Sequence, residues 1–297
     1  MITIVIPAYN RSHLIKRAIN SVLAQTETDW ELIIADDASE EDIKSVVDGF
    51  NNSKIKYLRN TTNKGNAGAR NLGVKNATGE YVAFLDSDDE YFPTFLAEIK
   101  KIISSSNNPG FVWSNVNRVK EDGSVHPNKF PSFWKPITAN NKYEYFLNGI
   151  YFGTDFGLTV RKNVFDEVGY FDENLRVSVD TDFILRMSAK TNFNFTNEIL
   201  VNTYEHSGGR VRTDLANKIK SYEIILEKHP LIKKNNTLLK KWKYKLMWMN
   251  FHAGNKPKAR KCFYEFMPFF DFKFYSIYLL FELFPKKMAM KIHKKIS

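Results

Sequence analysis

The sequence predicts an α/β fold in which a mostly parallel sheet carries helices on both faces. Over residues 1–90, short apolar runs rich in β-branched side chains alternate with segments of helical periodicity. The expected strands are Ile2–Ile6, Glu31–Ala35, Lys54–Arg59 and Tyr81–Leu85, and the expected helices are 14–22, with Ser12 as its cap, 43–50 and 68–76. Strands that alternate with helices pair in parallel, because each helix returns the chain to the same end of the sheet.

The net positive charge is concentrated in the C-terminal part of the chain. The 297 residues carry a net charge of +10, yet residues 229–297 alone sum to +13 and residues 1–228 to −3. We therefore expect a catalytic domain over residues 1–228 and a helical, basic, aromatic-rich region over residues 229–297. The acidic body argues against a nucleic-acid-binding protein, although the basic tail and the pI of about 9.3 suggest one.

Several classes of protein are excluded by simple counts. Cys262 is the only cysteine, so neither an internal disulfide nor a cysteine-built zinc site is expected, which fits a reducing compartment. No basic residue precedes the first apolar run, so a signal peptide is not expected. The apolar stretch Phe274–Phe284 falls short of the ~20 residues that span a bilayer. A cytoplasmic protein is the expectation.

Polar clusters follow three of the four strands. Asp86 and Asp88 leave an extended segment on the same side and offer oxygen ligands, which suit Mg²⁺ or Mn²⁺. The alternative is a solvated acidic turn, but four acidic residues within 86–90 repel one another without a counter-ion. Asp37 is placed to accept a hydrogen bond from a base or ribose, or else to cap a helix. Arg70, beside the glycines of a helix start, is directed towards a phosphate.

Together these motifs resemble the family-2 glycosyltransferases of the GT-A fold. The matching stretches are Ile-Pro-Ala-Tyr-Asn at 6–10, Asp-Asp-Ala-Ser at 36–39, 63–71, 79–89, 169–175 and 180–186. The resemblance covers roughly residues 1–210. It implies an inverting transferase that uses a nucleotide-activated sugar, expected to be a UDP-sugar, and a divalent metal.

The resemblance also implies roles for individual residues. Pro7, Tyr9 and Asp37 would contact the nucleobase and ribose, Asp86 and Asp88 would hold the metal on the diphosphate, and Asp180 would be the catalytic base. His206 matches a position where many members have a histidine, and it is either a metal or diphosphate ligand or a surface residue.

Asp180 has competing interpretations. It is placed to cap the helix expected over 181–189, and Asp182 is the nearest rival for the base, unless Arg186 one turn away pairs with it. Val179 stands where the family has Glu, so any help from that Glu in orienting the acceptor or the base is missing.

The acceptor and the partners are expected from the resemblance and from the tail. Relatives commonly build bacterial surface polysaccharides, so we expect a lipid-linked glycan acceptor. We expect residues 229–297 to bind the inner face of the cell membrane, with packing onto the body or a second subunit as the alternative. The other enzyme considered is a nucleotidyltransferase. It needs a basic phosphate-binding motif near the first strand, where only Arg11 is available.

Overall fold

The computed structural model describes residues 1–105, 108–128, 146, 157–205, 214–265, 272–285 and 288–289, and for 273, 274 and 277 only the backbone. The chain divides into two compact units, Met1–Glu173 with Val179–Gly208 and Asn174–Ser178 with Gly209–Ser297. This division lies about 20 residues before the expected one at 228/229. The reason is that helix α8 (Leu215–Lys228) packs on α10 (Asn236–Ala253), where the rings of Tyr222 and Trp242 lie 4.7 Å apart.

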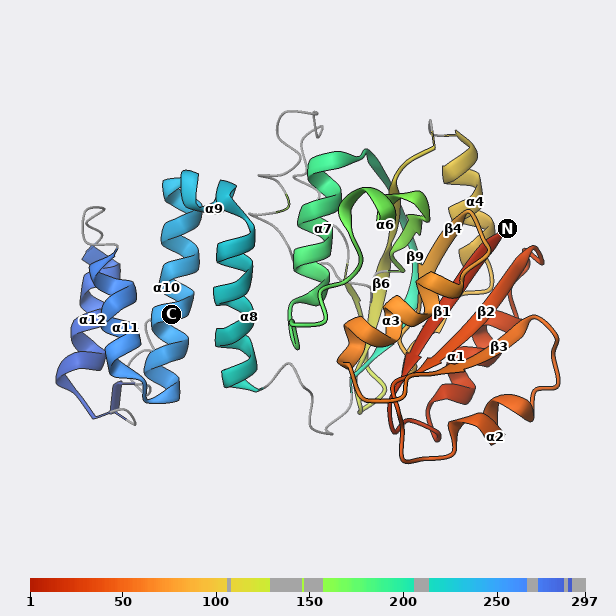
Figure 1. Ribbon diagram of the computed structural model, residues 1–297, viewed down its shortest axis with the longest axis horizontal. Helices are drawn as coiled ribbons and strands as arrows, with labels where there is room; N and C mark the ends of the chain where they lie inside the picture. The colour runs from red at the N-terminus through yellow and green to blue at the C-terminus, as the bar shows by residue number, and fades with distance from the viewer. Residues whose placement is uncertain are drawn as a thin grey trace. The chain divides into compact units, whose positions relative to one another are not determined.

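The first unit is built on one mixed sheet (Figure 1). Its described strands are β1 (Ile2–Ala8), β2 (Trp30–Asp36), β3 (Ile55–Arg59), β4 (Tyr81–Phe84), β5 (Glu90–Tyr91), β6 (Phe111–Val119), β7 (Val125–Asn128), β8 (Thr159–Arg161) and β9 (Phe193–Tyr204). Its described helices are α1 (Ile15–Leu23), α2 (Ile43–Asp48), α3 (Gly65–Asn76), α4 (Phe95–Ser105), α6 (Asn163–Val168) and α7 (Val179–Lys190). The strand order is β3-β2-β1-β4-β8-β6-β9-β5, with β7 paired to β6.

The parallel pairing that the sequence predicts holds for the first four strands, and among the later described pairs only β6 with β9 is parallel. Strands β3, β2, β1 and β4 are parallel, whereas β8 is antiparallel to both β4 and β6, and β5 is antiparallel to β9. The regular strand–helix alternation that implies parallel pairing stops after β4. The sheet is therefore mixed, and its parallel half carries the polar strand ends.

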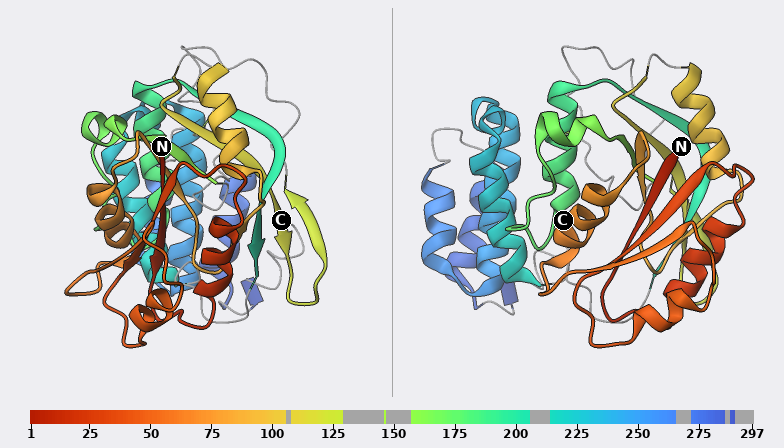
Figure 2. Two further views of the ribbon diagram at one scale, coloured as in Figure 1. Left: turned by 90° about the vertical axis from the view of Figure 1, so that its right-hand side faces the viewer. Right: turned by 45° about the vertical axis from the view of Figure 1, so that its right-hand side comes forward.

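Helices cover both faces of the parallel half, as expected. Figure 2 shows α1 and α3 on opposite sides of β1 and β2. Close packing of α3 on β1 depends on Gly73, because a Cβ there would lie 2.3 Å from a methyl group of Val5. Ser12 does not cap α1 as expected: the helix begins after Leu14 without a side-chain cap, and the Ser12 amide instead donates to Glu41.

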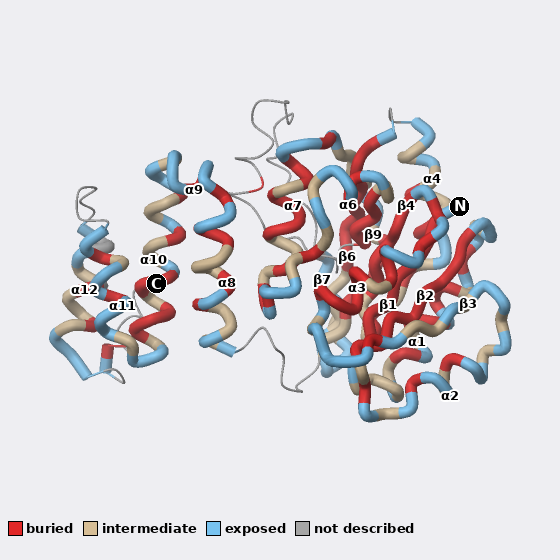
Figure 3. Tube along the Cα trace, in the orientation of Figure 1, coloured by how far each residue is buried: buried red, intermediate tan, exposed pale blue. Residues whose placement is uncertain are grey.

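The second unit is a set of helices around an aromatic core. It contains α8, α9 (Pro230–Lys234), α10, α11 (Lys256–Tyr264) and α12 (Phe272–Leu283). Its buried cluster is Met247, Phe251, Ala259, Phe263, Tyr278, Phe281 and Ala289. Figure 3 shows buried and exposed positions alternating along α8 and α10, the pattern of amphipathic helices. No helix in the described part of the chain is both long and apolar enough to cross a membrane.

Candidate active site

The carboxyl ends of β1, β2 and β4 lie at one edge of the sheet because these strands are parallel neighbours. Ala8 is in register with Asp36, and the amide of Asp37 donates to the carbonyl of Ala8 at 2.8 Å. On the other side of β1, the Leu85 amide donates to the Val5 carbonyl at 3.1 Å. The residues that follow each strand are thus brought to the same edge, as the alternation predicts.

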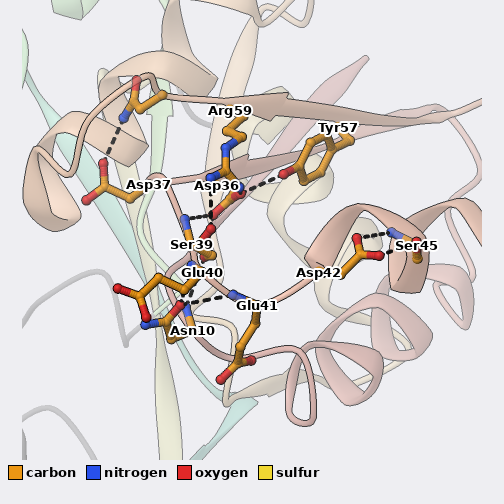
Figure 4. A network of polar contacts seen from close by, with 11 residues as sticks. Asn10, Asp36, Asp37, Ser39, Glu40, Glu41, Asp42, Ser45, Tyr57 and Arg59 are labelled. Carbon is orange, nitrogen blue, oxygen red and sulfur yellow. Dashed lines mark hydrogen bonds and ion pairs between the residues drawn. The ribbon is translucent and has the colours of Figure 1, made fainter.

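The loops after β1 and β2 are tied together by Asn10 (Figure 4). Its side-chain oxygen accepts from the backbone amides of Glu40 at 2.8 Å and Glu41 at 3.4 Å. Its backbone amide donates to Ser39 Oγ at 3.0 Å. Asn10 has a φ of 50°, a left-handed conformation that asparagine tolerates better than most residues. This loop is consequently held in one shape before any ligand is bound.

The two aspartates after β2 have different surroundings. Asp36 is fully buried and accepts from Tyr57 Oη at 2.6 Å and Arg59 Nη1 at 2.8 Å, so it fixes the edge of the sheet. Asp37 accepts from the Asn60 side chain at 2.8 Å and from the Lys64 and Gly65 amides at 3.0 and 2.7 Å. Asp37 therefore binds the backbone at the start of α3, whereas the helix that follows it in sequence, α2, is capped by Asp42.

The nucleoside contacts expected of Pro7, Tyr9 and Asp37 remain predictions. The three residues differ in how far they are exposed. Pro7 lies buried within β1, opposite Ala35, and Asp37 is only 2% exposed. Tyr9 is 44% exposed and stands just after β1. A carboxylate has about four acceptor positions, so the three hydrogen bonds at Asp37 leave one for a ribose hydroxyl or base.

The acidic turn after β4 brings three carboxylates together. One carboxylate oxygen from each of Asp86, Asp88 and Asp89 lies within 4.8 Å of the others. This all-oxygen donor set fits Mg²⁺ or Mn²⁺. Asp89, which the sequence reasoning left without a role, also accepts from the Tyr204 amide at 2.9 Å. Its position in the acidic run 86–90 could have indicated this role from the sequence. His206, the other expected ligand, lies outside the described residues.

Two arginines form ion pairs with carboxylates of this turn. Arg70, 2% exposed, reaches Asp180 Oδ1 through Nη1 at 2.8 Å and Asp86 Oδ1 through Nη2 at 2.9 Å, and Arg11 pairs with Asp88 at 2.5 Å. Burial raises the pKa of the Asp86 carboxyl, although the Arg70 charge opposes this shift. The repulsion argument for a metal is thus weaker than the sequence suggested, because arginines from α3 and from the loop after β1 supply counter-ions to the turn.

Asp180 and its rival Asp182 are clearly separated by their environments. Asp182 is fully buried and accepts from Arg186 Nε at 3.0 Å and Nη2 at 2.8 Å, the pairing foreseen from the sequence. Asp180 lies one residue inside α7, so it is not the helix cap, and its carboxylate is 28% exposed. Val179, where the family has Glu, is buried. Asp180 is the accessible carboxylate of the two.

A second residue of α3, which the sequence analysis left without a role, fastens the segment before α7. The Asn71 side chain donates to the Phe171 carbonyl at 2.9 Å and accepts from the Phe171 amide at 3.0 Å. Its neighbour Arg70 holds Asp180 and Asp86, and Asp37 holds the first turn of the same helix. Helix α3 therefore connects all three predicted parts of the site.

The mixed sheet with helices on both faces of its parallel half matches the GT-A fold of glycosyltransferases. The sequence profile described as Glycosyl transferase family 2 matches residues 3–169, and the chain belongs to this family.

Curated relatives are similar in sequence to part of this chain. Over 125 residues it is 39% identical to WfgD of Escherichia coli, named as a UDP-Glc:alpha-D-GlcNAc-diphosphoundecaprenol beta-1,3-glucosyltransferase; the match covers 42% of this chain and 49% of WfgD. Over 193 residues it is 31% identical to WcaA of E. coli K12, a glycosyl transferase named for colanic acid biosynthesis, covering 63% and 66% of the two chains. The chain thus spans about half the length of WfgD.

Two solved structures share the fold. S. aureus TarS 1–349 in complex with UDP-GlcNAc superposes with a TM-score of 0.64 at 17% identity, covering 84% of this chain and 72% of that one. The mannosyltransferase PcManGT from Pyrobaculum calidifontis, in complex with GDP-Man and Mn²⁺, gives 0.58 at 14% identity, covering 93% and 77%. At these identities the likeness shows the fold alone.

Proposed function

We propose that the protein transfers a sugar from a nucleotide sugar to an acceptor hydroxyl with inversion at the anomeric carbon. One observation carries the proposal: the buried guanidinium of Arg70 holds both Asp180 and Asp86. A partly exposed carboxylate able to act as a base, Asp180, therefore stands beside the acidic turn, within a single site. The family membership supports the reaction class.

In this reaction Asp180 takes up the proton of the acceptor, and the acidic turn faces the leaving group. Asp180 accepts the proton of the acceptor hydroxyl as that oxygen bonds to the anomeric carbon, while the bond from this carbon to the nucleoside diphosphate breaks. A single displacement of this kind inverts the configuration. When bound, Mg²⁺ or Mn²⁺ held by Asp86, Asp88 and Asp89 would supply positive charge for the leaving diphosphate.

We infer a UDP-sugar donor and a lipid-linked glycan acceptor, in bacterial surface polysaccharide synthesis. The names of WfgD and WcaA support this inference, and so does the UDP-GlcNAc bound to TarS. The test is a screen of nucleotide sugars for release of the nucleoside diphosphate, with and without metal. Release from a UDP-sugar is expected. Pyrophosphate release from a nucleoside triphosphate would instead indicate a nucleotidyltransferase.

The C-terminal helices are proposed to contact the inner face of the cell membrane. Ten large hydrophobic residues in the described part of the chain are exposed, and six of them lie at 264–288: Tyr264, Phe272, Tyr275, Leu283, Phe284 and Met288. On α12, Tyr278 and Phe281 pack into the core, whereas Phe272, Tyr275 and Leu283 follow a separate stripe at helical spacing. The net charge of +13 over residues 229–297 suits an anionic surface.

Replacing both Phe272 and Leu283 by Ser is expected to lower binding to anionic vesicles severalfold, because apolar burial and charge act together at an interface. The measurement is co-sedimentation of the full chain with phosphatidylglycerol-containing vesicles at low and high salt. Val125→Ser, at an exposed apolar residue of β7, is the control. A wild-type protein that stays in the supernatant, or a double variant that binds like the control, contradicts the proposal.

A further inference from the structure

The two arginines that pair with carboxylates of the acidic turn differ in their freedom to move. Arg70 is 2% exposed and bound to two carboxylates, so it cannot leave without opening the core. The Arg11 side chain is 35% exposed and that of its partner Asp88 is 21% exposed. In the ion pair between Arg11 and Asp88 both side chains are therefore partly exposed, whereas the arginine of the other two pairs is buried.

The backbone of Arg11 is fixed while its side chain is free to turn. Its carbonyl accepts from the amides of Leu14 and Ile15 at 3.0 and 3.1 Å, at the entry to α1. The guanidinium reaches Asp88, 77 residues away in the chain, through a long flexible stem. A change of side-chain rotamer alone moves this charge within the edge of the sheet, without any rearrangement of the loop.

A nearby arginine takes a different and more fixed position. The guanidinium of Arg17 lies 3.5 Å from the centre of the Tyr204 ring and donates to the backbone carbonyl of Asp88. Tyr204 is itself fixed by its hydroxyl, which donates to Glu90 at 2.7 Å. Burial, together with this hydrogen bond, raises the pKa of Tyr204 to about 12, so the hydroxyl stays a donor at neutral pH. Arg17 therefore supports the turn without occupying its carboxylates.

A divalent cation and Arg11 compete for the same carboxylate. Two like charges on one carboxylate repel each other, and the Arg11 charge is the one that can move away. A nucleoside diphosphate brings new negative charge to the same edge, and a guanidinium pairs with phosphate oxygens in a bidentate manner. Arg11 in its present position therefore disfavours a cation at Asp88, and a change of the Arg11 rotamer removes this competition.

We propose that Arg11 is a displaceable counter-ion of Asp88, which releases this carboxylate to a divalent cation and then binds a phosphate of the nucleoside diphosphate. The inference rests on the proposed function. It assigns Arg11 opposite effects on two ligands: it weakens binding of the cation alone and strengthens binding of the nucleotide.

The test compares wild type with Arg11→Gln, which removes the charge and keeps a similar length. Binding of Mn²⁺ alone is measured by electron paramagnetic resonance, and binding of UDP at saturating Mn²⁺ by calorimetry. We expect the variant to bind Mn²⁺ about threefold to tenfold more tightly and UDP about tenfold more weakly. Lys44→Gln, which removes an exposed charge on α2, is the control and should change neither affinity.

The outcomes separate this inference from the function on which it rests. Equal or weaker Mn²⁺ binding by Arg11→Gln would overturn the competition, and unchanged UDP affinity would overturn the phosphate contact. If the wild-type protein binds neither Mn²⁺ nor UDP, the proposed function itself fails. Because Arg11 is partly exposed, a thermal unfolding curve close to that of wild type is expected and verifies that the variant is folded.

Discussion

Replacing Asp180 by Asn is expected to lower kcat by about a thousandfold while changing UDP affinity only a few fold. Asparagine keeps the shape of the side chain and can still accept the hydrogen bond from Arg70, but it cannot take a proton. The measurement is steady-state transfer together with UDP binding. Near-normal turnover by Asp180→Asn would remove Asp180 from the role of base.

Asp182→Asn is the matched comparison on the same helix. It removes the buried negative charge that pairs with Arg186, so its main effect is expected on stability, at about 3 kcal/mol. The thermal unfolding midpoint measures this loss. A folded Asp182→Asn protein without turnover, beside an active Asp180→Asn protein, would reassign the base to Asp182.

Replacing Asp88 by Ala is expected to lower kcat/KM by about a hundredfold and to weaken donor binding at the same time, because cation and diphosphate are held together. Treatment of the wild-type enzyme with EDTA should reproduce the loss, and added Mn²⁺ or Mg²⁺ should restore activity.

Asp48→Ala, at an exposed carboxylate on α2, is the control for the loss of one negative charge and should stay active. Undiminished wild-type activity in EDTA would remove the metal from the reaction. Full activity of Asp88→Ala combined with sensitivity to EDTA would instead move the metal away from this turn.

The parallel half of the fold was predictable because its signals are local. Strands β1, β2 and β4 are buried along their whole length, and their sequences are apolar apart from Thr3, Glu31 and Asp36, while the helices between them keep a helical period. Strands β5 and β8 have two and three residues, too short for a periodic pattern. Their pairing with distant β9, β4 and β6 depends on tertiary packing.

The same distinction applies to the site. The positions of Asp86 and Asp88 follow from the parallel strand ends. The contact between Arg70 and Asp180 could not be predicted, because Asp180 lies 110 residues away in sequence and nothing local links the two side chains. Sequence reasoning directed Arg70 towards a phosphate, whereas both of its terminal nitrogens contact carboxylates.

Some of the C-terminal aromatic residues are buried and others are exposed, which the sequence could not distinguish. Phe251, Phe263, Tyr278 and Phe281 form a core within the C-terminal unit itself, which the sequence analysis did not expect, while Phe272 and Leu283 remain exposed. A helix that is apolar all round gives no sequence signal for which side is buried. The structure was needed to identify the exposed stripe of α12.

The anomeric configuration of the product tests the central claim most directly. Wild-type enzyme is incubated with an α-linked UDP-sugar, Mn²⁺ and a lipid-linked glycan acceptor, and the new linkage is determined by proton NMR. Single displacement assisted by Asp180 predicts a β-linked product. An α-linked product, formed with retention of configuration, would contradict the account.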